Sequence, residues 1–334
     1  MIQENIPLAK FTTFGIGGPA DYFIDVSTEE ELLEAVKFAS GKNIPITIIG
    51  GGSNVLISDS GIRGLVIKNT ISGFKVLNKT SNSQIKKSDA PRKEETLSQK
   101  NALNWRDLLY TEDATEFVNI RVKAGTNLGY LINKTIDQGI TGLQWFARIP
   151  GTVGGAIWNN IHGADKLFGD YVTSVKFISK KTGEVGILQH EDLGFQYNKS
   201  IFHDDTKIIL EADLNLFLGN KEKAKETMNE WIKRKSMQPY NSPGCTFSNL
   251  SEEEKQKYNL ENLSAAFVID KILELKGTRI GNAQISENHA NFIVNLGGAS
   301  ANDVMSLIKL INQKCQEKLG FKLKNEIKFL GDFL

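Results

Sequence analysis

Two glycine-rich loops lie about 100 residues apart in this chain, and they restrict its fold more than any other feature. An apolar run at residues 44–49 leads into the first loop, Gly50-Gly51-Gly52-Ser53-Asn54. The second loop is Ile149-Pro150-Gly151-Thr152-Val153-Gly154-Gly155. Glycine lets backbone N–H groups converge on an anion without interference from a Cβ atom, and Ser53 and Asn54 add side-chain donors. Both loops are therefore candidates for binding a pyrophosphate.

One glycine loop alone is equally consistent with an ordinary tight turn, because glycines mark turns so often. The first loop lacks the Lys-Ser/Thr of a P-loop, and it lacks the strand-then-helix context of a Rossmann fingerprint. Two such loops are more informative, since a dinucleotide such as FAD has a long pyrophosphate-bridged body that needs contacts from two walls. The pair therefore predicts a dinucleotide site.

Hydrophobic periodicity indicates a chain that mixes strands and helices. An acidic first turn at residues 29–31 supports the first helix, and an amphipathic pattern near the C-terminus places Cys315 in a core. Residues 78–117 are mostly polar, and we expect a mobile insertion there. The other elements expected in chain order are a strand at 21–26, a helix at 28–40, strands at 44–49, 55–57, 65–67 and 117–122, a helix at 128–138, strands at 172–178 and 208–217, and a helix at 221–235.

Composition excludes several classes of protein. The chain has 40 basic and 39 acidic side chains, so it has no broad cationic field for nucleic acid. Its 2 cysteines form neither a disulfide framework nor a zinc motif, so we expect no metal. No apolar run approaches the roughly 18 to 20 residues of a membrane span, and residues 1–10 do not resemble a signal peptide. We expect a cytoplasmic, monomeric protein without nucleic-acid or membrane partners.

Several further motifs stand in order along the chain, outside residues 78–117. They are Thr12-Thr13-Phe14-Gly15-Ile16-Gly17-Gly18-Pro19-Ala20, Gly142-Leu143, Asp270-Lys271, Leu275-Lys276-Gly277, Ile280-Gly281, Ala283-Gln284, Ser286-Glu287, His289-Ala290-Asn291-Phe292-Ile293-Val294-Asn295 and Glu326-Ile327-Lys328-Phe329-Leu330-Gly331. Together with the two glycine loops, these motifs resemble the UDP-N-acetylenolpyruvoylglucosamine reductase (MurB) family. The resemblance covers nearly the whole chain apart from residues 78–117.

The resemblance implies an α+β flavoprotein with a two-subdomain FAD-binding fold of the vanillyl-alcohol-oxidase type and a C-terminal α/β substrate domain. It places FAD-binding subdomains at 1–69 and 70–219, with a chain return at 323–334, and a substrate domain at 220–322. NADPH would reduce FAD, which would then reduce UDP-N-acetylglucosamine enolpyruvate to UDP-N-acetylmuramate, a peptidoglycan precursor. Both glycine loops and Asn160 would hold the cofactor, and the UDP-sugar would contact Tyr197, Asn198, Asn249 and His289.

Two residues match the catalytic groups of that family. Adding hydride to an enolpyruvyl group creates an enolate, which needs an acid and a stabilising partner. Cys245 stands where the family has a proton-donating serine or cysteine, although a free cysteine is often only a small buried hydrophobe. Glu326 matches the family's C-terminal glutamate, although strand alternation alone would favour a solvent-facing position.

The chain also departs from the family at charged positions. The family's Phe-Gly-Tyr-Arg-x-Ser becomes Phe195-Gln196-Tyr197-Asn198-Lys199-Ser200, so an arginine that would polarise the substrate carboxylate is missing. An asparagine supplies no charge and no bidentate fork. Arg148 and Lys199 are the candidate replacements, and we prefer Arg148 because it precedes the second loop, although it could instead pair with a flavin phosphate or lie on the surface.

Two lysines that could hold the nucleotide phosphates are also missing, since Met237 and Ser248 occupy their positions. Arg234, Lys235 and Tyr240 are possible substitutes. His162 lies in a segment that differs from the family's usual Asn-Ala-Gly. It could contact flavin or substrate, but a lone loop histidine is more often incidental than functional.

These departures keep two other functions open. One is an FAD-dependent oxidase or dehydrogenase that has changed its substrate on the same scaffold. The other is a non-catalytic flavin-binding paralogue, which the presence of Cys245 and Glu326 argues against.

Overall fold

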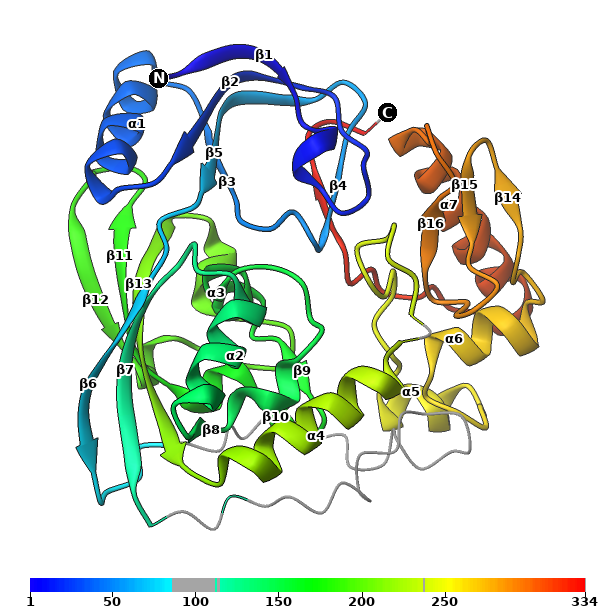
Figure 1. Ribbon diagram of the computed structural model, residues 1–334. Helices are drawn as coiled ribbons and strands as arrows, with labels where there is room; N and C mark the ends of the chain where they lie inside the picture. The colour runs from blue at the N-terminus through cyan, green and yellow to red at the C-terminus, as the bar shows by residue number, and fades with distance from the viewer. Residues whose placement is uncertain (86–111, 113–114, 237, 334) are drawn as a thin grey trace. The chain divides into compact units, whose positions relative to one another are not determined.

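The computed structural model describes residues 1–85, 112, 115–236 and 238–333 (Figure 1). These residues form two compact units. Unit 1 consists of Met1–Phe23, Gly52–Val66 and Met237–Leu334, and unit 2 consists of Ile24–Gly51 and Ile67–Ser236. The three-part division at 1–69, 70–219 and 220–322 stays a prediction. Most of the insertion predicted at 78–117 lies outside the described residues.

Unit 2 is built on an antiparallel sheet with the strand order β12-β11-β13-β7-β6, and β8 pairs with β13 beside this path. The strands predicted at 117–122, 172–178 and 208–217 are confirmed as members of this sheet. Its strands are β6 (Phe74–Thr80), β7 (Phe117–Lys123), β8 (Ile140–Thr141), β11 (Val172–Ser179), β12 (Val185–Gln189) and β13 (Lys207–Leu218). A small hairpin joins β9 (His162–Gly163) to β10 (Lys166–Leu167).

Helices cover one face of this sheet, as Figure 1 shows for α2 and α3. Alternate strand residues such as Ile120, Val122 and Leu214 pack with Leu131 of α2 and Ile157 of α3 in a single buried cluster. The helices of unit 2 are α1 (Glu29–Lys42), α2 (Leu128–Asp137), α3 (Val153–Asn159) and α4 (Lys221–Arg234). This core holds the end of the second glycine loop, because α3 begins within that loop, at Val153.

Helix α1 confirms the helix predicted at 28–40. Its N-cap Thr28 accepts a hydrogen bond from the Glu31 backbone, and the Glu31 side chain accepts one from the Thr28 N–H, which together form a capping box. The chain leaves the helix at Asn43, whose φ of 54° is left-handed. Local signals of this kind explain why the helix was readable from the sequence.

A network of ion pairs joins α1 to the sheet of unit 2. The Glu29 carboxylate accepts hydrogen bonds from the amines of Lys123 on β7 and Lys176 on β11, the latter at 2.9 Å. Lys123 also pairs with Glu211 on β13 at 2.6 Å, and Glu211 is 8% exposed. The hydrogen bond from Lys123, followed by that from Lys176, holds the pKa of Glu29 below its ordinary value.

We expect Glu29→Gln to make the unfolding free energy depend less steeply on pH in the acid range. The folded pKa of Glu29 lies below the unfolded value, so this pair stabilises the protein above the unfolded pKa and is lost as pH falls through the folded pKa. Near pH 7 the variant should lose about 1 kcal/mol of unfolding free energy, and the loss should shrink in acid. Urea unfolding at several pH values measures this. Glu30→Gln on the same helical turn is the matched control, and parallel curves for wild type and Glu29→Gln would contradict the assignment.

A second sheet contains four strands in the order β1-β2-β5-β3. The boundary between the two units falls within β2 and β5. The apolar runs predicted at 21–26, 44–49 and 65–67 all lie in this sheet. Its strands are β1 (Gln3–Pro7), β2 (Pro19–Val26), β3 (Ile46–Ile49) and β5 (Ile62–Asn69).

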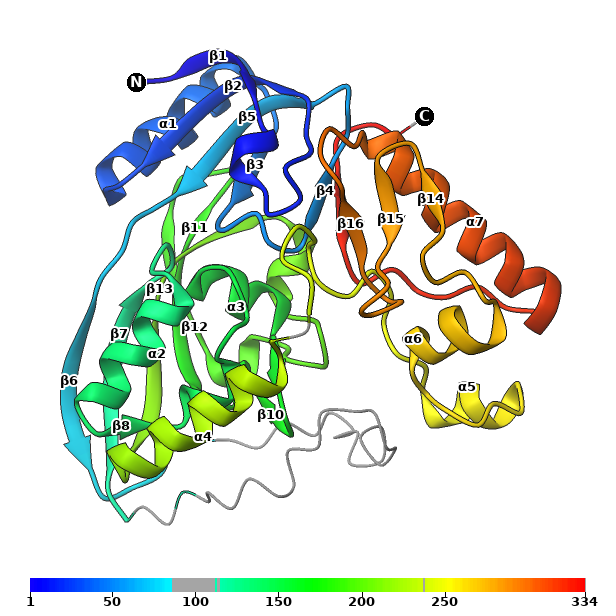
Figure 2. The same ribbon diagram turned by 45° about the vertical axis from the view of Figure 1, so that its right-hand side comes forward.

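Unit 1 packs its longest helix against a small antiparallel sheet, β14-β15-β16, as Figure 2 shows. The C-terminal strand β17 pairs in parallel with β4, the strand that follows the first glycine loop. Its elements are β4 (Val55–Ile57), α5 (Glu252–Lys257), α6 (Ala265–Phe267), β14 (Arg279–Ile280), β15 (Ala283–Ile285), β16 (Ile293–Asn295), α7 (Ala301–Leu319) and β17 (Lys328–Leu330).

Helix α7 confirms the amphipathic helix predicted near the C-terminus. Ser300 and Asp303 form its capping box, and Gly320 ends it with a φ of 80°. Cys315 is fully buried on the apolar face, and this burial raises the pKa of its thiol to about 11. The Asp59 carboxylate accepts the N–H groups of Ala301 and Asn302, which ties the turn after β4 to the start of α7.

No helix within the described ranges has both the length and the apolar character of a membrane span. Among the same residues, no group of three His, Cys, Asp or Glu side chains is arranged to hold a metal ion. The predicted cytoplasmic location, monomeric state and lack of a nucleic-acid partner stay predictions.

Candidate active site

The two glycine loops meet backbone to backbone in unit 2. A Cβ atom on Gly51 would lie 2.7 Å from the Cα of Gly151, and one on Gly50 would lie 2.4 Å from the Thr152 hydroxyl. Neither distance leaves room for a side chain, so glycine is required by the contact as well as by the turn. The structure thus joins two segments that the sequence separates by about 100 residues.

The second loop uses its own N–H groups to build the start of α3. Thr152 caps the helix by accepting the Gly155 N–H at 3.3 Å. The N–H groups of Val153 and Gly154 donate to backbone carbonyls of Thr126 and Ala124 at 2.9 and 2.7 Å. These donors are committed to the protein, so phosphate-binding donors are expected on the first loop.

In unit 1 the first loop continues through Gly52, Ser53 and Asn54. Gly52 has a φ of 60°, and a Cβ atom there would lie 2.0 Å from the carbonyl oxygen of Phe11. The Asn54 carbonyl accepts the N–H of Lys328 at 3.0 Å, which fixes the end of the loop to the C-terminal segment. The loop is therefore held in one conformation at both ends.

Asn160 fixes a distant turn within unit 2. It is fully buried and left-handed, with a φ of 42°. Its side-chain amide donates to the carbonyl of Gln196 at 2.8 Å and accepts the N–H of Gly169 at 2.7 Å. The contact of Asn160 with the cofactor stays a prediction. In the structure, its side chain holds the Gln196 turn by the hydrogen bond to Gln196.

That turn presents Tyr197 and Asn198 at its tip. Gln196 and Lys199 close it with two backbone hydrogen bonds of 3.0 and 3.1 Å. The Tyr197 hydroxyl lies 3.3 Å from Nε2 of His162, and the two rings pack with centroids 4.7 Å apart. Asn198 has a φ of 53°, and both polar atoms of its side chain are buried without a hydrogen-bond partner among the described residues. Sequence reasoning favoured an incidental role for His162, and the structure places this residue in β9, in contact with Tyr197 of the turn.

Arg148 lies directly before the second loop in a left-handed conformation, with a φ of 64°. Its guanidinium donates to the carbonyl of Ser236 at 3.3 Å. Arg234 pairs with Glu230 at 2.9 Å, and the amine of Lys235 lies 4.5 Å from the centre of the Trp231 ring. The last two side chains therefore contribute to the packing around α4, and Arg148 stays the predicted cation of the site.

In unit 1 the structure brings residues 245–248, called here the Cys245 segment, together with Glu326. The backbone N–H of Ser248 donates to the carbonyl of Lys324, and the backbone N–H of Glu326 donates to the carbonyl of Thr246, both at 2.9 Å. These bonds flank an antiparallel bridge between Phe247 and Asn325. Thr246 therefore lies opposite Glu326, and Cys245 is its chain neighbour.

Thr246 adds a feature that sequence reasoning missed. Its side chain is 1% exposed, and its hydroxyl has no hydrogen-bond partner among the described residues. Residues opposite each other in an antiparallel pair share a face, so this hydroxyl lies on the face that carries Glu326. A buried unpaired hydroxyl is costly in a folded protein and is typical of functional sites.

His289 and Asn249 also lie in unit 1. His289 is hydrogen-bonded to Asn291, which is hydrogen-bonded to Phe247, and Asn249 directly follows Ser248 in the chain. His289 packs edge-on against Phe292 with ring centroids 4.7 Å apart, and burial lowers its pKa. Its Nδ1 accepts the N–H of Asn291 at 3.3 Å, which suits a neutral imidazole. The side-chain amide oxygen of Asn249 accepts the N–H of Ala265 at 3.2 Å, which links Asn249 to the start of α6.

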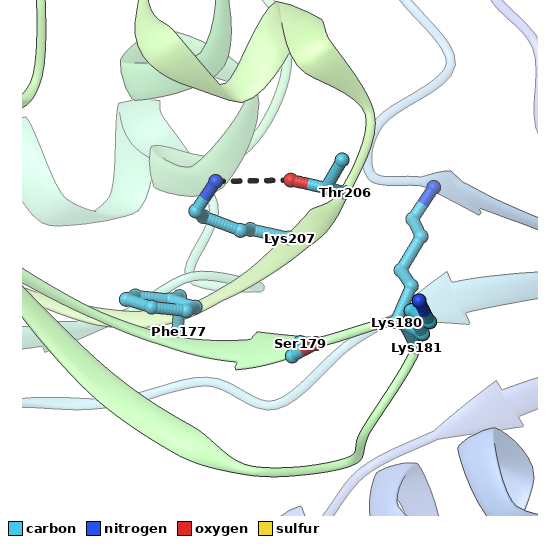
Figure 3. A pocket seen from close by; sticks show the side chains of 6 residues that line it. All are labelled: Phe177, Ser179, Lys180, Lys181, Thr206 and Lys207. Atoms are coloured by element: carbon cyan, nitrogen blue, oxygen red, sulfur yellow. Dashed lines mark hydrogen bonds between the residues drawn. The ribbon is translucent and has the colours of Figure 1, made fainter.

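One hollow in unit 2 lies apart from all of these residues. It encloses about 320 Å³ between the ends of β11 and β13, and Figure 3 shows its lining side chains. Asp205 neutralises Lys180 at 2.5 Å, and Asp204 neutralises Lys207 at 2.9 Å. Geometry alone therefore does not make it an anion site, and none of the predicted site residues lines it.

Comparisons with known proteins agree with this geometry. The model of an FAD binding domain matches residues 20–85 and 109–188. The model of the UDP-N-acetylenolpyruvoylglucosamine reductase C-terminal domain matches residues 237–330. The expected α+β fold with an FAD-binding part is thus confirmed.

Three relatives support the match over the whole chain. The UDP-N-acetylenolpyruvoylglucosamine reductase of Prochlorococcus marinus is 32% identical, with 99% of this chain and 98% of the relative covered. The enzyme of the same name from Chlamydia muridarum is 34% identical, with 98% and 94% covered. The crystal structure of MurB from Thermus caldophilus superposes with a TM-score of 0.72 at 29% identity and covers 99% of this chain and 100% of its own. The chain therefore belongs to the UDP-N-acetylenolpyruvoylglucosamine reductase family, a family of oxidoreductases.

Proposed function

We propose that this protein reduces UDP-N-acetylglucosamine enolpyruvate to UDP-N-acetylmuramate, with FAD as its cofactor and NADPH as the electron donor. Family membership supports the reaction, and the pairing of Glu326 with the Cys245 segment is the observation that carries it. Two backbone hydrogen bonds hold the candidate acid and the candidate carboxylate in adjacent segments, although about 80 residues separate them in the chain. That product is a precursor of peptidoglycan.

The glycine loops fit the cofactor. Their contact at Gly51 and Gly151 contains no side chain, which leaves smooth backbone for a pyrophosphate to approach. In this proposal Gly50-Gly51-Gly52-Ser53-Asn54 supplies N–H and side-chain donors, and the loop from Pro150 to Gly155 forms the second wall. Asn160 contacts the cofactor in this proposal, and its side chain also fixes the Gln196 turn.

The chain's own residues supply the proton transfer. Bound FAD supplies the hydride, taken from NADPH, that adds to the methylene carbon of the enolpyruvyl group. Cys245 then donates its thiol proton to the adjacent carbon, which completes the lactyl ether, and solvent returns a proton to the thiolate. Glu326 works at the carboxylate end of the developing enolate, and the Thr246 hydroxyl lies on the same strand face.

Arg148 supplies the positive charge that the chain lacks at Asn198. Tyr197 and the unpaired amide of Asn198 add neutral hydrogen-bond donors for the polar groups of the UDP-sugar. Asn249 and His289 complete the substrate contacts within unit 1. Lys199, the other candidate cation, is exposed at the end of the turn.

Replacing Arg148 with Ala should slow substrate reduction by the pre-reduced flavoprotein about 10²- to 10³-fold, because one electrostatic partner of the enolate is lost. Reduction of the flavin by NADPH should change little. Stopped-flow absorbance separates the two half-reactions. Arg63→Ala removes an exposed arginine that is paired with Asp21, away from the predicted site residues, and serves as the control. Unchanged reoxidation in Arg148→Ala would remove Arg148 from the site.

The function itself is tested anaerobically. The purified protein is loaded with FAD, reduced with NADPH and mixed with UDP-N-acetylglucosamine enolpyruvate while flavin absorbance is followed. Rapid reoxidation with formation of UDP-N-acetylmuramate supports the proposal. Flavin that is reduced but ignores this substrate, and reoxidises only with oxygen, would indicate an oxidase, and failure to bind FAD would contradict the loop assignment.

A further inference from the structure

Asn291 connects the two segments that carry the candidate proton donor and the candidate carboxylate. It lies between the His289 turn and β16 in unit 1, and it is 2% exposed. Its side-chain amide forms two hydrogen bonds with the backbone of one residue, Phe247. The side-chain oxygen Oδ1 of Asn291 accepts the N–H of Phe247 at 2.9 Å, and the side-chain nitrogen Nδ2 donates to the carbonyl of Phe247 at 2.8 Å.

The backbone of Asn291 extends this contact by one residue. Its carbonyl accepts the N–H of Thr246 at 2.7 Å, while the carbonyl of Thr246 accepts the N–H of Glu326. The peptide groups that follow Cys245 are thus bonded to Asn291 on one side and to the Glu326 segment on the other. Asn291 therefore fixes the backbone that directly follows Cys245, beside the Glu326 segment.

Asn291 and Phe247 are themselves held in place by further contacts. The Asn291 N–H donates to Nδ1 of His289, and the Phe247 side chain is fully buried in the apolar cluster of unit 1. Every one of these bonds lies in a buried or half-buried setting, where an unpaired amide would cost about 1–3 kcal/mol. An apolar residue would fill the same space, so packing alone does not require an asparagine here.

We propose that Asn291 is a positioning residue that sets the direction from which Cys245 delivers its proton. The proposal rests on the proposed function, because it concerns protonation of the enolpyruvyl carbon. That carbon becomes the stereocentre of the lactyl group when it gains its proton. A thiol held in one place protonates one face, whereas a displaced thiol leaves the enolate to be protonated by water from either face.

The variant Asn291→Ala tests this with FAD-loaded full-length protein. The rate of flavin reduction by NADPH should stay within about twofold of wild type. Reoxidation by UDP-N-acetylglucosamine enolpyruvate should slow about 10- to 100-fold, less than the roughly 10²- to 10⁴-fold that general acid catalysis supplies, because the thiol is displaced but still present. Chiral analysis of the released lactyl ether should give one configuration for wild type and a mixture for the variant.

A double variant separates positioning from general damage. If Asn291 acts through Cys245, then Asn291→Ala should add little to the loss already caused by Cys245→Ala, because the group it positions is gone. Asn291→Ser, which keeps one short hydrogen-bonding group, should fall between wild type and Asn291→Ala. This milder variant also serves if Asn291→Ala does not fold.

Asn295 provides a matched control four residues away. Its side-chain amide donates to the carbonyl of Phe14 at 2.8 Å and accepts the N–H groups of Gly297 and Ala299, and the described part of the chain shows no hydrogen bond from this side chain to the Cys245 segment. Asn295→Ala should therefore lower stability without changing product configuration.

Three outcomes would overturn the proposal: equal effects of Asn291→Ala and Asn295→Ala on reoxidation, losses that multiply in the double variant, or a single product configuration in a slowed Asn291→Ala. Failure of the proposed function would be distinguishable, since the wild-type reduced flavoprotein would then not react with the substrate at all.

Discussion

Cys245→Ala is expected to slow reoxidation of the pre-reduced flavoprotein by UDP-N-acetylglucosamine enolpyruvate about 10²- to 10⁴-fold, the range that a positioned general acid supplies. The methyl group of alanine has no acidic proton, so the enolate would be protonated only by water, which is slower. The bonds from Asn291 and Glu326 to the neighbouring backbone do not involve the thiol, so the segment should keep its place. The loss should therefore fall on one chemical step.

Stopped-flow absorbance measures this step after anaerobic reduction with NADPH. Flavin reduction itself should match wild type, since Cys245 is needed only for protonation of the substrate. Cys245→Ser should recover a large part of the rate, because a hydroxyl can also donate a proton. Reoxidation of Cys245→Ala at the wild-type rate would show that another group, or water, protonates the substrate.

The other cysteine gives the control. Cys315 is fully buried in α7, where it packs with apolar neighbours of unit 1. Cys315→Ala should lower the unfolding free energy by about 1–2 kcal/mol through the lost packing, with no change in the reoxidation rate. Equal rate losses in both variants would point to a general effect of removing a thiol.

Gly51→Val is expected to weaken FAD binding about 10- to 100-fold or more. A Cβ atom at this position would lie 2.7 Å from the Cα of Gly151, and both groups are backbone that cannot rotate away. The two loops would have to separate, which costs about 1–3 kcal/mol for overpacking. The donors of the two loops would then no longer keep the spacing that the dinucleotide needs.

Titration of the apoprotein with FAD, followed by flavin fluorescence, gives the dissociation constant. Gly41→Ala is the matched control, since Gly41 lies in α1 and no atom comes within 4 Å of a Cβ placed there. That change should leave FAD affinity unaltered and should stabilise the helix by a few tenths to 1 kcal/mol. Wild-type FAD affinity in a folded Gly51→Val would show that the loop contact does not shape the site.

Much of the local structure could be predicted from the chain because the signals were local. The capping residues Thr28 and Glu31 lie next to the helix they begin, and the alternation in residues 117–122 is the period of a strand with one buried face. The motifs of the two glycine loops and of Cys245 and Glu326 pointed to the family, which the comparisons show.

Other features could not be predicted because they depend on contacts between distant segments. Asn160 stays a predicted cofactor contact, and the structure adds that its side-chain amide is bonded to Gln196 and Gly169. Arg234 and Lys235 stay candidate phosphate ligands, and the structure adds that they contact Glu230 and Trp231. No sequence pattern indicates which carbonyl or ring will lie beside a given side chain.

The sequence by itself determined the longer helices α1, α2, α4 and α7, the main strands of the two larger sheets and the identity of the family, because each follows from neighbouring residues or from motif order. Only the tertiary structure decided that Gly51 touches Gly151, that Thr246 lies opposite Glu326 and that Asn291 clamps Phe247. The physical reason is that hydrogen bonds and van der Waals contacts act over a few ångströms in space, and chain folding alone brings residues 40 to 100 positions apart within that range.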